Sequence, residues 1–483
     1  MLDKLAPMPY RILKTFPLAA LLVVVLPGLA KASSDPFNTE SSLQPPPGFV
    51  QNGERDFEPC RPAPVGVPLS LPAVVDAALC ANPQTREVWA NARVQAAQVG
   101  VAESAYLPAL DGTISASRND NRGGALASSV THRQRDFGLS LSWLIYDFGG
   151  REANLKNANA LLTAANASQD ARIQTLFLAA VQAYYQLQSS QAARDAAVEA
   201  EKAAQQSFNA AEARYKVGAA TPADKLQAQT AWSQAVLNRI TAEGDVNAGL
   251  GALANVMGMV ASTAIALAPG GGVPLTQVTQ VEVSVQTMID EALQKRPDLR
   301  AAQAQARAAE AAVDTTRAKG RPSLSLGING DDIKSSGLPD AYPSTFGLTL
   351  KIPLFSGFNS TYQIKAAEAA AEAKRAQTEQ TRLQVALDVW NVYYSLGTAG
   401  QSLHASADLV ASAEQSQRVT LGRYKAGLGT ILDVLNAQSA LASARQQQIQ
   451  TLYKWHVARV SLAQAMGTLD RGMIDSLEER AKP

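Results

Sequence analysis

The sequence predicts a mainly α-helical protein with a transmembrane β part, built from two copies of one unit. Three observations predict this fold class: a motif recurs 209 residues apart, two long Ala-rich runs carry a heptad-like pattern, and four short segments alternate apolar with small or polar residues. The chain has 483 residues and a formal net charge of +1. Bulk charge therefore gives no indication of a nucleic-acid partner.

The repeat is clearest in RYKVGAATPADKLQAQ at 214–229 and RYKAGLGTILDVLNAQ at 423–438, which share nine of sixteen residues. Paired tyrosines at 184–185 and 393–394 have the same offset of 209 residues. Two upstream prolines recur at an offset of 214, pairing Pro83 with Pro297 and Pro108 with Pro322. The chain is therefore predicted to be a duplicated unit.

Residues 1–32 are predicted to be a secretory signal peptide. An apolar run at 17–30 follows several basic residues and ends in the small-x-small pattern Ala30-Lys31-Ala32. The alternative is an uncleaved anchor, but a spanning helix needs roughly 20 apolar residues and this run is shorter. Residues 33–69 follow as a Pro-rich N-terminal extension without helical or strand period.

The chain has two cysteines, Cys60 and Cys80. An exported chain meets an oxidising compartment, where these thiols could form a disulfide across a short loop. The alternative is two unrelated thiols. We expect the disulfide.

Two long helices are predicted at about 151–217 and 360–426. In the first, apolar residues advance by four, three, four and three positions, which is a heptad-like seam. The seam residues are Ile173, Phe177, Ala180, Tyr184 and Leu187. At 1.5 Å per residue each helix would reach ~100 Å, so a coiled coil or helical barrel is expected rather than a globular core.

Four strands are predicted at about 110–118, 136–146, 322–330 and 344–355. Phe137, Leu139, Leu141 and Trp143 alternate with small or polar residues, and Phe346, Leu348, Leu350 and Ile352 do the same. Strands of ~10 residues have the length of tilted membrane strands, and polar segments connect each pair. Aromatic residues gather where the second strands end, at Trp143, Tyr146, Phe148, Phe355 and Phe358.

A soluble four-stranded sheet packed on helices is the alternative to this membrane interpretation. Four strands cannot close a barrel, and an open strand edge is not tolerated in lipid. The membrane interpretation therefore requires several chains to combine their strands.

Together these landmarks resemble the TolC family of outer-membrane channels, which serve efflux and type I secretion. The resemblance covers about 70–467. It rests on landmarks that recur in order in the two copies: NP/RP, YLP/GRP, LIYDFGG/IPLFSGF, YY and RYKxG. It implies a homotrimer with a twelve-stranded barrel and a periplasmic helical tunnel. It also divides the chain into parts. Residues 70–269 and 285–467 would be the two repeats, 270–284 an equatorial linker and 468–483 a C-terminal tail. Similar members export bacterial toxins such as adenylate cyclase haemolysin.

Turns at about 217–222 and 426–430 would join each long helix to a returning helix. Thr221 is a predicted N-cap with Asp224 at N3, and Thr430 and Asp433 repeat this pair. Pro222 suits the first helical position. The glycines Gly218 and Gly427 supply the permissive backbone that ends the preceding helices.

The resemblance also gives these turns functional roles. It places Asp433 and Asn436 in a constricting selectivity ring, and Asp224 and Tyr424 in a tie between the two turns; the basic residue expected in that tie falls on Gly429. Adaptor-contact residues would be Arg214, Tyr215, Gly218, Arg423 and Gly427. The alternative for both carboxylates is helix capping alone, and the two roles are compatible.

The sequence does not indicate an enzyme, a cofactor or a metal site. His132, His404 and His456 are isolated, and no phosphate loop or nucleophile elbow is present. The resemblance implies a passive exit across the periplasm and outer membrane. Its partners would be a periplasmic adaptor and an inner-membrane ABC or proton-driven transporter, with a cargo that the residues do not identify. The alternative function is a soluble periplasmic coiled-coil adaptor or scaffold.

Overall fold

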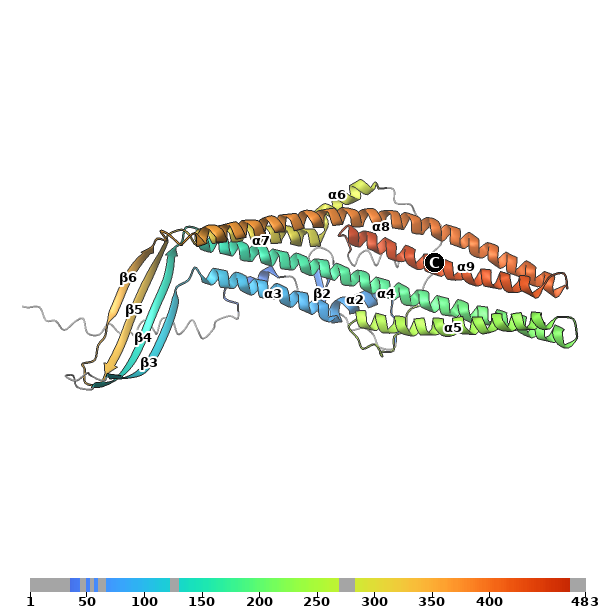
Figure 1. The fold of residues 1–483 in the computed structure, drawn as a ribbon, viewed down its shortest axis with the longest axis horizontal. Coiled ribbons are helices and arrows are strands. Elements are labelled where there is room, and N and C mark those ends of the chain that lie inside the picture. The colour runs from blue at the N-terminus through green and yellow to red at the C-terminus, as the bar shows by residue number, and fades with distance from the viewer. Residues whose placement is uncertain are drawn as a thin grey trace, which may run out of the picture. The chain divides into compact units, whose positions relative to one another are not determined.

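A computed structural model describes residues 35–43, 49–52, 56–59, 67–121, 130–268 and 283–469. The predicted signal peptide, Cys60 and nearly all of the predicted linker and tail lie outside the described residues. The chain divides into two compact units. One contains the four long strands and the other contains the long helices (Figure 1).

The elements follow in the order short strands, helix pair, strand pair and long helix hairpin, and the last three are then repeated. The first part comprises η1 (Thr39–Ser42), β1 (Phe49–Asn52), β2 (Asp56–Pro59), α2 (Leu71–Ala81), α3 (Pro83–Ser104), β3 (Ala109–Asn121), β4 (Val130–Tyr146), α4 (Gly150–Lys216) and α5 (Pro222–Val256). The second comprises α6 (Val285–Lys295), α7 (Pro297–Ala318), β5 (Ser323–Ser335), β6 (Ser344–Lys351), α8 (Asn359–Lys425) and α9 (Ile431–Ala465).

The strand unit is a four-stranded sheet in the order β3-β4-β5-β6. The antiparallel register of β3 and β4 places Leu110 opposite Leu141 and Ile114 opposite Phe137. These residues share one face because side chains alternate along a strand. Ile114 is 84% exposed and Phe346 in β6 is 74% exposed. The sheet therefore has an apolar face that the described residues leave exposed.

The strands differ from the expected ranges where they leave the apolar band. β3 extends to Asn121 and β4 begins at Val130, within a segment expected to be a polar connection. Backbone pairing needs no apolar side chain, so the hairpin continues past the alternating region. β6 ends at Lys351 because Pro353 has no backbone N–H to donate to the ladder.

The helical unit contains two matched hairpins. α4 and α8 have 67 residues each, and α5 and α9 have 35 residues each. α4 packs along α5 and α7, while α8 packs along α7 and α9 (Figure 1). Many buried positions are alanine, which lets long helices approach closely. Among the helices in the described ranges, none is both long and apolar enough to cross a membrane.

A polar residue before each repeated proline forms a hydrogen bond to the end of a returning helix. In the first copy it lies between α2 and α3 and contacts α5, and in the second it lies between α6 and α7 and contacts α9. Asn82 donates from Nδ2 to the backbone oxygen of Val256 at 2.9 Å. At the equivalent position, Arg296 donates from Nη1 to the backbone oxygen of Ala465 at 3.4 Å. A glycine with positive φ lies beside each, and a Cβ on Gly467 would lie 3.0 Å from Cα of Arg296. Both copies thus share this junction.

His456 gives the helical unit a pH-dependent stability. Its ring stacks on Tyr185 with centroids 4.3 Å apart, and it also contacts Trp455. Burial, with a smaller contribution from the charge of Arg459, lowers the pKa of His456 from 6.5 to about 4. The unfolded chain therefore binds the proton more tightly than the folded chain between about pH 6.5 and 4. Stability is lost as the pH falls through this range.

Acidification from pH 7 to pH 5 should therefore lower the free energy of unfolding by about 2 kcal/mol per chain through His456. His456→Phe keeps a stacked ring but cannot take up a proton, so its profile should be flatter. Thermal unfolding of the helical circular dichroism signal at several pH values measures this. Exposed His404→Phe is the control; identical profiles for wild type and His456→Phe would contradict the assignment.

Candidate functional site

Each long helix ends in the same tight turn, which we call a tip. Gly218 follows α4 and Gly427 follows α8, both with φ of +75°. This left-handed conformation favours glycine. Ala219 N donates to Arg214 O at 2.8 Å, and the equivalent hydrogen bond after α8 has the same length. The glycines thus end the helices as the sequence predicts.

A capping box starts each returning helix. Thr221 N donates to Asp224 Oδ2 at 2.9 Å, and Asp224 N donates to Thr221 Oγ1 at 3.2 Å. Thr430 and Asp433 form the same pair at 3.0 and 3.2 Å. Hydrogen bonds from the threonines lower the pKa of both carboxyl groups. Both acids therefore carry charge at neutral pH and cap their helices.

Arg214 makes a side-chain tie between the two tips. Its Nη1 donates to the backbone oxygen of Tyr424 at 3.2 Å, and its guanidinium carbon lies 4.8 Å from the centre of that ring. After the hydrogen bonds from Thr221, the charge of Arg214 also lowers the pKa of Asp224. Arg214 therefore interacts with both Tyr424 and Asp224, the two residues that the resemblance places in a tie between the tips.

An apolar cluster lies beneath this tie. Tyr424 is 7% exposed and belongs to a cluster drawn from all four helices of the tips. The other buried members are Ala211, Ala228, Ile431 and Val434. The ring of Tyr424 therefore packs in the core between the hairpins rather than projecting into solvent. Separation of the tips would expose this cluster.

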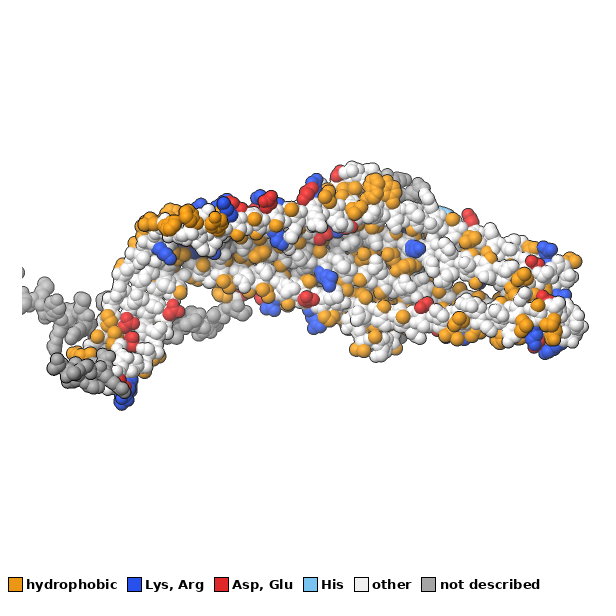
Figure 2. Space-filling view, viewed as in Figure 1, with side chains coloured by type: hydrophobic (Ala, Val, Ile, Leu, Met, Phe, Trp, Pro, Cys, Tyr) orange, Lys and Arg blue, Asp and Glu red, His pale blue; other side chains and the backbone are white. Residues whose placement is uncertain are grey.

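The remaining predicted residues lie on the tip surface. Asp433 and Asn436 are exposed and three positions apart on α9, which places them on one face of the helix. Tyr215 and Arg423 are exposed, and Lys225 Nζ lies 5.7 Å from the ring centre of Tyr215. Figure 2 shows charged side chains of both signs on the surface of the tips. A polar, charged surface is available for a partner.

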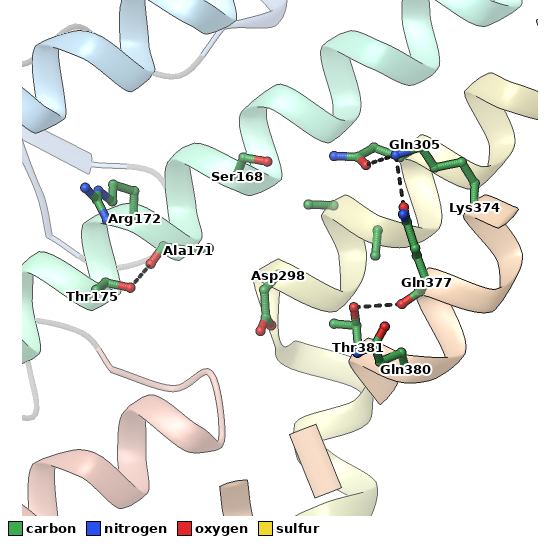
Figure 3. A pocket seen from close by; sticks show the side chains of 12 residues that line it. Ser168, Ala171, Arg172, Thr175, Asp298, Gln305, Lys374, Gln377, Gln380 and Thr381 are labelled. Atoms are coloured by element: carbon green, nitrogen blue, oxygen red, sulfur yellow. Dashed lines mark hydrogen bonds between the residues drawn. The ribbon is translucent and has the colours of Figure 1, made fainter. Parts of the chain in front are cut away.

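A polar groove lies farther along the hairpins, between α4, α7 and α8 (Figure 3). Its volume is about 610 Å³. Lys374 Nζ bonds there to Gln377 Oε1 at 3.0 Å and to Gln305 Oε1 at 3.4 Å. The described residues contain no group of His, Cys, Asp or Glu able to hold a metal ion. The groove is open, and most of the side chains that line it are polar, so it can hold water.

Sequence reasoning did not find the position of Arg214 in the tie, because its partner is 210 residues away in the chain. The only available signal was the doubled RY pair at the two tips. Cys80 lies in α2, whereas Cys60 is outside the described residues. Their disulfide therefore stays a prediction.

Duplicated helical hairpins with capped tips, joined to a sheet with one exposed apolar face, define a subunit of a membrane channel. The outer membrane efflux protein family model matches residues 74–259 and 288–468. The chain belongs to this family, which is a family of outer-membrane transport channels rather than of enzymes.

Three comparisons illustrate the relationship. The chain is 31% identical over 462 residues to Protein CyaE of Bordetella pertussis, covering 94% of this chain and 96% of the relative. It is 26% identical over 399 residues to outer membrane protein TolC of Vibrio cholerae, covering 80% and 88%. A membrane protein from Pseudomonas aeruginosa, at 22% identity, superposes with a TM-score of 0.74 over 90% and 97% of the two chains. The predicted family and fold class are thereby confirmed.

Proposed function

We propose that three copies of this chain form one channel-tunnel. Three chains with four strands each would close a twelve-stranded barrel in the outer membrane, and the long helices would continue it through the periplasm. The observation that carries this proposal is the sheet itself. It exposes an apolar face and leaves β3 and β6 as edges, which lipid tolerates only if other chains pair with them.

The channel would be the passive exit of a tripartite efflux pump or a type I secretion system. Energy and cargo selection would come from an inner-membrane ABC or proton-driven transporter, connected through a periplasmic adaptor. Planar-bilayer conductance and the heat-sensitive oligomer size of the purified chain test this. A stable trimer with a small conductance is expected. A chain that washes off membranes in carbonate and forms no channel would instead indicate a periplasmic scaffold.

The tips would form the periplasmic aperture, with Asp433 lining it. Three exposed carboxylates facing one pore would attract cations, as acidic rings do. Asn436 lies on the same face without charge, so the ring would hold three carboxylates rather than six. The tips would be held together next to this ring by the contacts of Arg214 with Tyr424 and Asp224.

Asp433→Ala should weaken divalent-cation block of the channel on the order of tenfold, because it removes every carboxylate of the proposed ring. Asn436→Asp should strengthen the block in the same recordings. Asp408→Ala removes an exposed carboxylate from α8 away from the tip and serves as the control. Equal block in Asp433→Ala and wild type would remove Asp433 from the aperture.

The tip surfaces would also bind the adaptor, through Tyr215 and Arg423 and around Gly218 and Gly427. Gly427→Val should lower adaptor affinity by about fivefold and leave the trimer intact. A β-branched residue at φ +75° costs roughly 1–2 kcal/mol, and the turn distorts to relieve this strain. Co-purification with the cognate adaptor measures this. Leu428→Val is the neighbouring control; loss of the trimer in Gly427→Val would make the glycine a folding residue instead.

A further inference from the structure

Three arginines lie together on the exposed apolar side of the sheet, beyond its apolar band. The register places Arg118 of β3 directly opposite Arg133 of β4, and Ala116 opposite Arg135. Their positions alternate in phase with Ile114 and Phe137, so the arginines share the face of those apolar residues. All three arginines are exposed. We call this set the arginine cluster.

The arginine cluster is electrostatically unfavourable in isolation. Like charges directly opposite each other across an antiparallel pair destabilise it, and Arg118 and Arg133 are such a pair. Arg118 is partly compensated, since its Nε lies 3.2 Å from Asp120 Oδ1. Within the part of the chain that the structure describes, Arg133 and Arg135 have no carboxylate in an ion pair. A bound anion would relieve the repulsion.

The position of the cluster identifies the kind of anion. Arg135 is two residues from Phe137, which begins the apolar band. The segments that lead to α3, α4, α7 and α8 all attach at the opposite end of the strands. If those helices lie in the periplasm, the cluster lies at the leaflet remote from them. A ligand there would combine acyl chains along the band with a negative headgroup beside the arginines.

The two faces of the sheet differ in charge. Asp111 and Asp136 occupy the alternate positions of β3 and β4, and Asp331 Oδ1 approaches the same face at Gly138. An anion would therefore be repelled from that face and attracted to the arginine face. Lys334 adds a further positive charge on β5, although its Nζ lies 3.9 Å from Asp332. Asp120 also lies on the arginine face, where it pairs with Arg118. That face therefore keeps the charges of Arg133 and Arg135, which attract an anion.

We propose that Arg118, Arg133 and Arg135 bind the phosphate of a lipid headgroup in the outer leaflet, with its acyl chains against Ile114 and Phe137. The guanidinium fork suits this role because it binds phosphate oxygens bidentately. The proposal rests on the proposed function, which places this sheet in the outer membrane. Free phosphate lacks the acyl chains and would gain nothing from the apolar band.

The test uses the full-length trimer purified in detergent and incubated with phosphatidylcholine vesicles, with or without bis-phosphorylated lipid A. Native mass spectrometry counts the lipid A molecules retained. Arg118→Gln/Arg133→Gln/Arg135→Gln should lower retention at least ~tenfold, since charge-assisted hydrogen bonds contribute about 1.5–3 kcal/mol each. Removal of three arginines on α4 and α8, the half-buried Arg194 and the exposed Arg382 and Arg418, by Arg194→Gln/Arg382→Gln/Arg418→Gln should leave it unchanged.

Equal retention by wild type and the triple variant would overturn the proposal. Displacement of lipid A by millimolar inorganic phosphate would also overturn it, because the cluster would then be a site for a free anion. If the triple variant fails to assemble, Arg133→Gln/Arg135→Gln decides by the same count. Conductance is recorded on each sample: a conducting wild type that retains no lipid A refutes only the lipid site, whereas a non-conducting, monomeric wild type refutes the proposed channel.

Discussion

Arg296→Ala should lower the free energy of unfolding by about 2 kcal/mol, because it leaves two carboxylates that are only about two-thirds buried without their shared partner. Arg296 is 7% exposed and holds Asp298 through two hydrogen bonds of 2.9 and 2.6 Å. Its Nη2 also lies 3.1 Å from Asp388 Oδ2 on α8. Burial alone would raise the pKa of Asp298, but the hydrogen bond and charge of Arg296 outweigh it and lower that pKa.

Thermal unfolding monitored by helical circular dichroism measures the loss. Arg300→Ala is the matched control, because it removes the same charge one helical turn later from an exposed pair with Asp170. That change should cost less than ~1 kcal/mol. Equal losses in the two variants would show that the buried network contributes no more than a surface ion pair.

The sequence predicted the duplicated architecture because its signals are local and periodic. Heptad spacing and Ala content indicated α4 and α8, and their observed bounds differ by one residue from the expected ranges at each end. The strand alternation likewise predicted that Phe137, Leu139 and Leu141 share one face of β4. Each of these features is determined by neighbours a few positions away in the chain.

Features that depend on partners distant in sequence could not be predicted. Pro83 and Pro297 were visible as matched positions, but nothing local showed that the residue before each, Asn82 or Arg296, reaches the end of a returning helix. Glycine at the left-handed tip positions was predictable, whereas the positive φ of Phe148 and Phe358 was not. An aromatic residue reaches that region only when its surroundings impose it.

Arg214→Ala should raise the open probability of the channel on the order of tenfold, because it removes the side-chain tie between the tips. A cation–π contact contributes about 0.5–2 kcal/mol and a charge-assisted hydrogen bond about 1.5–3 kcal/mol. Each 1.4 kcal/mol corresponds to tenfold in an equilibrium constant, so even part of this tie would change the population of open tips appreciably. The apolar cluster around Tyr424 would remain and would limit the effect.

Single-channel recording of open probability decides whether Arg214 acts as a latch. Arg214→Lys keeps the charge beside Asp224 but loses the planar fork, so it should give an intermediate value. Lys216→Ala is the control, because Lys216 is exposed and pairs with Glu212 on its own helix at 3.4 Å. If Arg214→Ala opens no more often than Lys216→Ala, the apolar cluster alone closes the tips. In that case Tyr424→Ala, which removes the buried ring, should open them instead.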